Sequence, residues 1–331
     1  MNQNDTNTYR GPLFIVGMPR SGTKLLRSLL NQHPRVCILE IETEILPWLA
    51  RHVGEYGDLS DPGNFKRLYD QVTKFPFFLY RTDEGKVIDA TKWHSACANS
   101  EVHGIFEALV RIDTGTKCDT DVIWGDKSPS YINNISLISS LFPQAKIIHI
   151  VRDVRDFCLS IHQAWGKDML RAAQRWVDGI SAAKNAGAGL GDRFLEIRYE
   201  DLLTDTAKVM NMICRFLGID FVLAMTTLVK PSENIGSAKG LTVVMKENTG
   251  KYAILLPGNK LLRIEQIAGQ LLQQYGYELV HPLQTTQRLS KTEMLIRQFK
   301  DGVSLVRDES RQRGLIGALR FHLRYFQTTR G

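Results

Sequence analysis

Cysteines, internal repeats and long hydrophobic runs are scarce or missing in this sequence. The five cysteines are widely spaced and form no Cys-x-x-Cys pair, so neither a disulfide framework nor a zinc site is expected. No apolar run approaches the roughly 20 residues of a membrane-spanning helix, and no basic-then-apolar signal peptide opens the chain. A reducing cytoplasm is the location that these absences favour.

Positive charge is in excess only at the C-terminal end. The net charge is +7, and from His281 onward ten Lys and Arg stand against four acidic residues, which leaves the rest of the chain near neutral. No nucleic-acid partner is therefore expected for the core. The tail from residue 283 interleaves Arg with apolar residues. It either packs on the domain as a helical extension or forms a basic amphipathic helix that meets an anionic membrane or an acidic partner.

Residues 13–24 carry the most informative pattern of the sequence. An apolar run at 13–16 is long enough for a buried strand, and Gly17 and Gly22 bracket a short loop after it. Leucines at helical spacing follow in residues 25–30. A strand, a glycine-bracketed loop and a helix together form a cradle in which backbone N–H groups point at one anion.

This loop departs from the one that binds nucleoside triphosphates. That loop has Lys directly after its second glycine and then a hydroxyl residue that holds magnesium. Here Gly22 is followed by Thr23 and then Lys24, so the hydroxyl and the amine are exchanged, and Arg20 lies inside the loop. The pattern predicts a site for a phosphate-like group, but not for ATP–magnesium in the usual way.

Strands alternate with helices along the chain. The expected strands are residues 13–16, 87–90, 122–124, 146–151 and 194–197, and the expected helices are residues 102–111, 131–141, 155–183, 204–217 and 260–275. This alternation predicts an α/β fold with a central parallel sheet flanked by helices on both faces, a P-loop-like three-layer sandwich. Ligands of such sheets bind at the carboxyl ends of the strands.

A second anion site is predicted after the strand at 146–151. Arg152 follows that strand directly, and Ser160 comes eight residues later in the next helix. An Arg at a strand end and a helical Ser can hold a phosphate, the Arg through charge-assisted hydrogen bonds. The competing interpretation is that Arg152 is only the ion-pair partner of Asp153.

The loop at 17–24, read together with Arg152 and Ser160, resembles the sulfotransferases that use 3′-phosphoadenosine 5′-phosphosulfate (PAPS). In that family the first loop holds the 5′-phosphosulfate, and the strand-end Arg and the later Ser hold the 3′-phosphate. Further segments that resemble the family are residues 124–129, 198–203, 249–252 and 275–277. The matches run in the family's order from about residue 12 to residue 280.

The resemblance implies an organisation and a reaction. Residues 1–11 would be a flexible N-terminus, 12–282 the sulfotransferase domain and 283–331 a basic helical extension. The implied reaction is in-line transfer of the sulfuryl group of PAPS, without a metal, to a hydroxyl or amine. The acceptor would be a small molecule, a carbohydrate or a peptide, and a homodimer is compatible with the sequence. The alternatives are a P-loop small-molecule kinase and a non-catalytic nucleotide-binding scaffold.

The resemblance also assigns residues to the nucleotide. The residues implied to bind it are Arg20, Ser21, Gly22, Thr23 and Lys24 at the 5′ end, Arg152 and Ser160 at the 3′-phosphate, and Tyr199, Ser237 and Lys251 as further contacts. Lys24 departs from the family pattern, in which similar members often carry a second Thr or Ser. It either contacts the same phosphate or points to solvent.

Three residues are implied to carry the chemistry. Lys127 lies where the family has a catalytic Lys or His and would stabilise the charge of the leaving phosphate, with Arg20 as a second cation. Glu42 opens a Glu-Thr-x-Ile-x-Pro segment like that of the protein-tyrosine sulfotransferase branch, where the first Glu is the general base. Glu40 and His94 are its rivals for that role.

Overall fold

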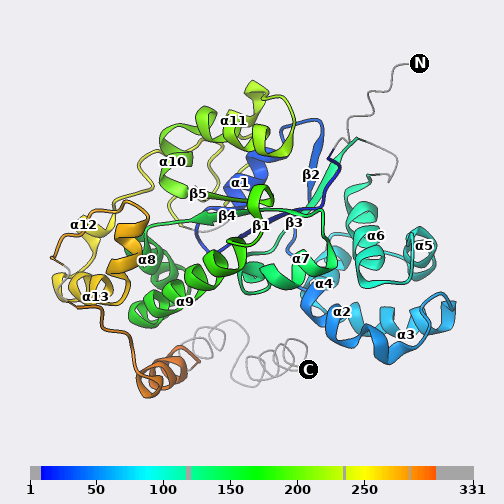
Figure 1. Ribbon diagram of the computed structural model, residues 1–331, viewed down its shortest axis with the longest axis horizontal. Helices are drawn as coiled ribbons and strands as arrows, with labels where there is room; N and C mark the ends of the chain where they lie inside the picture. The colour runs from blue at the N-terminus through cyan, green and yellow to red at the C-terminus, as the bar shows by residue number, and fades with distance from the viewer. Residues whose placement is uncertain (1–8, 117–120, 234–235, 283–284, 303–331) are drawn as a thin grey trace.

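The computed structural model describes residues 9–116, 121–233, 236–282 and 285–302. Five strands form one parallel sheet in the order β2-β3-β1-β4-β5 (Figure 1). The strands are β1 (Leu13–Gly17), β2 (Val36–Ile38), β3 (Ile123–Lys127), β4 (Lys146–Val151) and β5 (Phe194–Arg198). At least one helix connects each strand to the next, because parallel neighbours need a crossover.

The helices lie on both faces of this sheet (Figure 1). Their bounds are α1 (Thr23–Leu30), α2 (Leu46–His52), α3 (Pro62–Val72), α4 (Pro76–Asp83), α5 (Ala90–Ala96), α6 (Val102–Thr114), α7 (Ile135–Leu141), α8 (Val154–Trp165), α9 (Met169–Gly187), α10 (Tyr199–Thr204), α11 (Thr206–Leu217), α12 (Tyr252–Leu255) and α13 (Gly258–Gln274). The sheet is therefore the middle layer of a three-layer sandwich, as the alternation of strands and helices predicted.

Alternate residues of β1 face two separate hydrophobic cores. Leu13 and Ile15 belong to the core formed with α1, α10 and α11. Phe14 and Val16 belong to the larger core formed with α6, α8, α9 and α13. All four side chains are fully buried, because a central strand with helices on both faces has no solvent side. This explains why the strand appears in the sequence as an uninterrupted apolar run.

The strand predicted at residues 87–90 is wrong. Val87 is 67% exposed, and residues 86–89 have no regular structure. The Asp89 side chain instead accepts the Lys92 N–H at 2.9 Å and so caps the N-terminus of α5. The helix cap at Asp89 therefore outweighs the strand propensity of the residues before it, and no strand forms here.

Two of the predicted helices are divided in the structure. The single helix predicted for 155–183 is α8 and α9, since Gly166 ends α8 with φ 62° and the Asp168 carboxylate caps α9. The helix predicted for 131–141 begins as a separate 3₁₀ turn, Pro129–Asn133, before α7. Each division comes at a residue whose chemistry favours a helix end.

The parallel register brings the ends of three strands to one edge. Ile15 of β1 lies opposite Lys127 of β3, and Gly17 of β1 lies opposite Ile150 of β4. The loop after β1, the residues after β3 and Arg152 after β4 therefore emerge side by side.

The described part of the C-terminal extension docks on α9. Residues 291–302 are helical, and the Asp301 carboxylate accepts the Asp168 N–H and an Arg171 guanidinium N–H, both at 2.7 Å. Leu289, just before this helix, is buried. Residues 303–331, which carry most of the predicted basic extension, lie outside the described residues.

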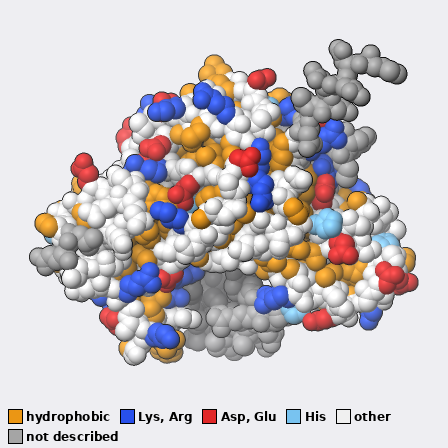
Figure 2. All heavy atoms as spheres, in the orientation of Figure 1, with side chains coloured by type: hydrophobic (Ala, Val, Ile, Leu, Met, Phe, Trp, Pro, Cys, Tyr) orange, Lys and Arg blue, Asp and Glu red, His pale blue; other side chains and the backbone are white. Residues whose placement is uncertain are grey.

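The surface carries charges of both signs. On the face drawn in Figure 2, the described Lys and Arg side chains lie interspersed with acidic ones rather than gathered in one field. Within the described ranges, no helix combines the length and apolar character needed to cross a bilayer.

Candidate functional site

The loop between β1 and α1 contains two residues with positive φ. Arg20 has φ 69° and Gly22 φ 90°, and the Ser21 N–H donates to the Met18 carbonyl at 3.1 Å. A Cβ at Gly22 would lie 2.3 Å from the ring of Tyr199, so this position requires glycine. The loop consequently curls around the N-terminus of α1, where backbone N–H groups point at an anion.

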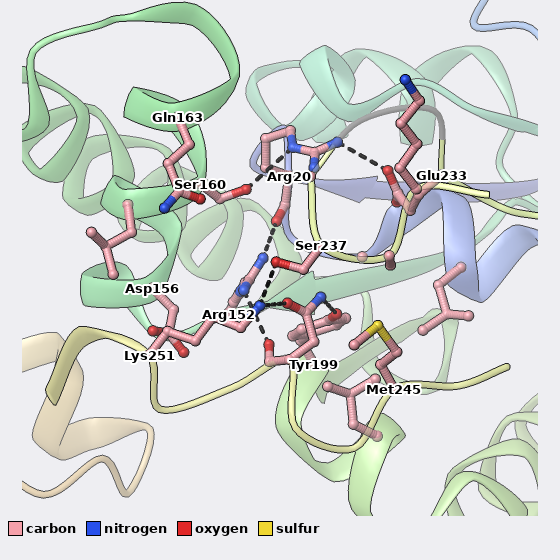
Figure 3. A pocket seen from close by; sticks show the side chains of 18 of the residues that line it. Arg20, Arg152, Asp156, Ser160, Gln163, Tyr199, Glu233, Ser237, Met245 and Lys251 are labelled. Carbon is pink, nitrogen blue, oxygen red and sulfur yellow. Dashed lines mark hydrogen bonds and ion pairs between the residues drawn. The ribbon is translucent and has the colours of Figure 1, made fainter. Parts of the chain in front are cut away.

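Arg152 connects this loop to the elements around it (Figure 3). Its guanidinium donates to the Arg20 carbonyl at 2.9 Å and to the Asn248 carbonyl at 3.2 Å. The guanidinium carbon also lies 4.7 Å from the centroid of the Tyr199 ring. Trp176 fixes the backbone here by donating its indole N–H to the Arg152 carbonyl at 3.0 Å. A strand-end arginine is thus held with its charge beside the first loop.

The local alternative for Arg152, an ion pair with Asp153, is not what the structure has. The Asp153 carboxylate pairs with Arg155 at 2.7 Å. Ser160, one of the two residues predicted for the second anion site, accepts the Arg20 Nε–H at 3.3 Å. The structure therefore brings Arg152, Ser160 and the first loop to one place.

The late segment around Lys251 completes this group. The Lys251 ammonium donates to the Ser237 hydroxyl at 2.6 Å and to the Asn248 side-chain oxygen at 2.7 Å. The Asn248 amide donates in turn to the Tyr199 hydroxyl at 2.8 Å. Burial and the nearby Arg152 charge lower the pKa of Lys251. In Figure 3 the labelled side chains of Tyr199, Ser237 and Lys251 lie together below Arg20.

Together these elements enclose a cavity of about 320 Å³. Seven of the predicted nucleotide residues line it: Arg20, Gly22, Arg152, Ser160, Tyr199, Ser237 and Lys251. We call it the nucleotide cavity. Six of these seven residues carry a cation or a hydroxyl, and three of the six follow the ends of β1, β4 and β5. Such a lining suits a ligand with more than one anionic group.

A second cavity of about 270 Å³ adjoins the first. Glu42, Thr23 and Lys24 line it, and Arg20, Gly22 and Glu233 line both cavities. We call it the acceptor cavity. Lys24 and Glu42 both lie in the wall of this cavity. Ser21 lines neither cavity and is fully buried.

Lys127 and Glu42 form an ion pair at this second cavity. Lys127 ends β3 with a fully buried side chain, whereas the Glu42 side chain is 33% exposed. Burial lowers the pKa of Lys127, and the Glu42 carboxylate opposes that shift. The Glu42 carboxylate reaches the cavity and can accept a proton there. The Lys127 ammonium behind it can stabilise negative charge.

The two rivals for the base lie elsewhere. The Glu40 carboxylate pairs with Lys230 and lines neither cavity. His94 lies in α5, where its Nε2 is 3.0 Å from the Leu59 carbonyl, and it too lines neither cavity. Among the three candidates, only Glu42 is beside Lys127.

Three residues of the site were not predicted. The Asp156 carboxylate accepts the N–H groups of Gly250 and Tyr252 at 2.6 and 2.9 Å and so anchors the late loop. Asn248 and Glu233 come from the irregular segment between α11 and α12. Only Asp156 had a signal in the sequence, because it lies in the first turn of the helix that follows Arg152.

Comparison with known proteins agrees with this geometry. Residues 12–222 match the model of the sulfotransferase family. Protein-tyrosine sulfotransferase 1 of Danio rerio is 25% identical over 252 residues, which are 73% of this chain and 62% of that protein. Protein-tyrosine sulfotransferase 2 of Gallus gallus is 25% identical over 290 residues, 80% of this chain and 69% of that protein. The chain thus spans less than two thirds of the Danio rerio relative.

Solved structures show the same fold. The sulfotransferase domain of the Synechococcus PCC 7002 olefin synthase aligns with a TM-score of 0.55 and 26% identity over 84% of this chain and 99% of that domain. The sulfotransferase domain of the curacin biosynthetic pathway aligns with a TM-score of 0.53 and 20% identity over 82% of this chain. Since the family model covers well over half of the sequence, including the first loop and Arg152, the chain belongs to the sulfotransferase family.

Proposed function

We propose that this chain transfers the sulfuryl group of PAPS to an acceptor by in-line displacement. The observation that carries the proposal is the meeting of two cavities at Arg20, with Glu42 in the wall of the second cavity and the buried Lys127 paired with it. A donor with anionic groups at both ends would fill the first cavity, and the acceptor would approach through the second.

The residues present fit such a donor. The Ser21 hydroxyl is buried in the first loop without a hydrogen-bond partner among the described residues, and so is Nε of Arg152. Buried polar groups of this kind are costly unless a partner satisfies them. Phosphate or sulfate oxygens in the nucleotide cavity, which Arg152 lines, would supply an acceptor to its Nε–H.

The roles follow from the positions. The acceptor oxygen attacks sulfur while its proton passes to Glu42. The bond between sulfur and the 5′-phosphate oxygen breaks, and 3′-phosphoadenosine 5′-phosphate (PAP) leaves with the electron pair. Lys127 and Arg20 stabilise the charge that grows on that oxygen. Arg152 and Ser160 would hold the 3′-phosphate, and Tyr199, Ser237 and Lys251 would close the nucleotide cavity.

The acceptor class and the setting are part of the proposal. We propose a small molecule, a carbohydrate or a peptide as acceptor, and the protein-tyrosine sulfotransferase relatives support a phenolic hydroxyl as the first chemistry to try. Widely spaced cysteines support a cytoplasmic location. The kinase alternative is disfavoured by Thr23 and Lys24, whose order is the reverse of the magnesium-binding loop.

Two measurements test the proposal. Calorimetric titration should show that PAP binds in preference to ATP–Mg²⁺, and a preference for ATP would overturn it. Transfer of radiolabelled sulfate from PAPS to a library of phenols, alcohols and amines should fall about 10²–10⁴-fold in Glu42→Gln, the typical cost of losing a general base. Transfer should fall by a comparable factor in Lys127→Ala. It should not fall in Lys92→Ala, which removes an exposed lysine. Full activity in both site variants would refute the roles while leaving the family intact.

A further inference from the structure

A fully buried polar cluster lies directly behind the Glu42–Lys127 pair. Its members are Asp126, Ser128 and, from other segments, Thr43 and Tyr131, and each is at most 1% exposed. The Thr43 hydroxyl donates to the Asp126 carboxylate at 2.6 Å, and the Ser128 hydroxyl lies 3.1 Å from the same oxygen. The Thr43 N–H donates to the Ser128 hydroxyl at 3.2 Å. Thr43 is therefore held at two points, through its backbone and through its side chain.

With the Asp126 carboxyl ionised, the direction of each hydrogen bond in this cluster follows from the donors and acceptors present. An ionised carboxylate only accepts hydrogen bonds, so the Thr43 and Ser128 hydroxyls both donate to Asp126. The Thr43 oxygen, 2.8 Å from the Tyr131 hydroxyl, must then accept the tyrosine proton. The Tyr131 oxygen in turn accepts the Leu46 N–H at 3.0 Å. Two chains of donors thus end on one carboxylate, with no donor or acceptor among them in conflict.

The sheet places this cluster opposite the reacting groups. Asp126 lies across from Phe14 in the strand register and Lys127 across from Ile15, so their side chains leave β3 on opposite faces. The Glu42–Thr43 dipeptide crosses this strand end, with Thr43 bonded to Asp126 and Glu42 bonded to Lys127. The Ser128 hydroxyl accepts the N–H of the peptide group between Glu42 and Thr43. This hydrogen bond fixes the orientation of that peptide plane, and with it the direction in which the Glu42 side chain leaves the backbone.

We propose that Asp126 is a positioning residue that acts through Thr43 to hold Glu42 against Lys127 and toward the acceptor cavity. Asp126 touches neither cavity itself. We call the two hydrogen bonds that hold Thr43, one to Asp126 and one to Ser128, the clamp. Without it the Glu42 side chain, which is one third exposed, would sample other rotamers, and a displaced base loses much of its rate advantage. The proposal rests on Glu42 having the role proposed above.

Turnover of PAPS to PAP and sulfate, with water as the acceptor, measures the effect without a known acceptor. Asp126→Asn and Thr43→Val should each lower kcat about 10–100-fold with the KM for PAPS changed less than about twofold, because positioning is lost and nucleotide binding is not. Thr43→Ser should restore most of the turnover lost in Thr43→Val, since it keeps the hydroxyl. Thr73→Val, which removes a helix-end hydroxyl that lines neither cavity, is the matched control.

A double-mutant cycle separates positioning from general stability. In a Glu42→Gln background, Asp126→Asn should lower kcat by less than about threefold further. The reason is that Asp126 acts only through Glu42, whose carboxylate is already absent in this background. An undiminished further loss would overturn the proposal, and so would an unchanged kcat in both Asp126→Asn and Thr43→Val.

Hydrogen exchange tests the clamp independently of sulfuryl transfer. Amides of residues 40–46 should exchange at least about tenfold faster in Thr43→Val than in the wild type, while residues 147–152 stay protected. Unchanged protection at 40–46 would refute the clamp even in an active enzyme. A wild type that exchanges as expected but does not convert PAPS would instead refute the proposed function.

Discussion

Arg20 and Glu233 form an ion pair at the boundary between the two cavities. The Arg20 guanidinium lies 2.9 Å from the Glu233 carboxylate, and both side chains are largely shielded from solvent. Arg20 is also the cation inside the first loop, and its backbone carbonyl accepts a hydrogen bond from Arg152. Any anion that takes Arg20 as a partner therefore competes with a carboxylate that belongs to the protein.

Removing that competitor should strengthen nucleotide binding. Glu233→Gln should lower the Kd for PAP about fivefold, corresponding to about 1 kcal/mol for a partly buried pair. Isothermal calorimetry measures the change. Glu247→Gln, the same loss of charge at an exposed position of the same irregular segment, should have a much smaller effect. A weaker affinity in Glu233→Gln would indicate that Glu233 orients Arg20 rather than competing for it.

Arg152 should discriminate between nucleotides by their 3′ end. Arg152→Gln should weaken PAP binding about 10–100-fold, because hydrogen bonds to charged groups contribute about 1.5–3 kcal/mol. Adenosine 5′-phosphate, which lacks the 3′-phosphate, should lose much less affinity in the same variant. Calorimetry with both ligands gives the comparison, and Arg215→Gln on the exposed face of α11 serves as the control. Equal losses for the two ligands would place Arg152 away from the 3′-phosphate.

Lys127 should set the alkaline limit of activity. Burial lowers its pKa below the ordinary 10.5, and the role proposed for it needs the charged form. The kcat for PAPS turnover should therefore fall at a pH below 10.5. Lys127→Arg, whose guanidinium stays protonated, should remove this limb from whatever activity it retains. In Glu42→Gln the fall of kcat should begin at a still lower pH, because the carboxylate that opposes the lowering of the Lys127 pKa is gone.

Asp126 should make stability depend on pH with a definite sign. Burial raises the pKa of its carboxyl from 3.8 to about 7, against hydrogen bonds from Thr43 and Ser128 that lower it. A raised pKa stabilises the folded state below the unfolded pKa, and that contribution is lost as pH rises through about 7. The difference in unfolding free energy between the wild type and Asp126→Asn should thus fall with rising pH, by at most about 1.4 kcal/mol per unit. Urea unfolding at several pH values measures it, and a pH-independent difference would contradict the expectation.

The start of the C-terminal extension should contribute to stability through Asp301. This carboxylate is 5% exposed and accepts the Asp168 N–H and an Arg171 N–H. Asp301→Asn should lower the unfolding free energy by about 1–3 kcal/mol, because Arg171 loses its charged partner. Urea midpoints check this, with the exposed Lys300→Gln as control. An unchanged midpoint would mean that the docked helix does not stabilise the domain.

The sequence identified those parts of the site that follow regular elements. The loop at Gly17–Gly22 and the pair Arg152 and Ser160 could be found because each follows a strongly apolar strand. The parallel register of the sheet then brings the ends of these strands to one edge. The three-residue strand β2 was missed, since Val36, Cys37 and Ile38 are too few to form a pattern.

Other parts of the site could not be predicted from local pattern. Glu233 and Asn248 lie in an irregular segment, where no periodicity indicates which side chain turns inward. Asp126 was visible in the segment at 124–129, but its role depends on Thr43 and Tyr131, which only the folded chain brings to it. Buried polar clusters are assembled from distant segments, so their members look unremarkable one at a time.

The two cavities have a kinetic consequence. They share Arg20, Gly22 and Glu233 and otherwise have separate walls, so the donor and acceptor of the proposed reaction would be bound at the same time. The sulfuryl group can then pass directly from one molecule to the other without resting on the protein. Initial-rate plots for the two substrates would accordingly intersect, as they do when a ternary complex forms before any product leaves.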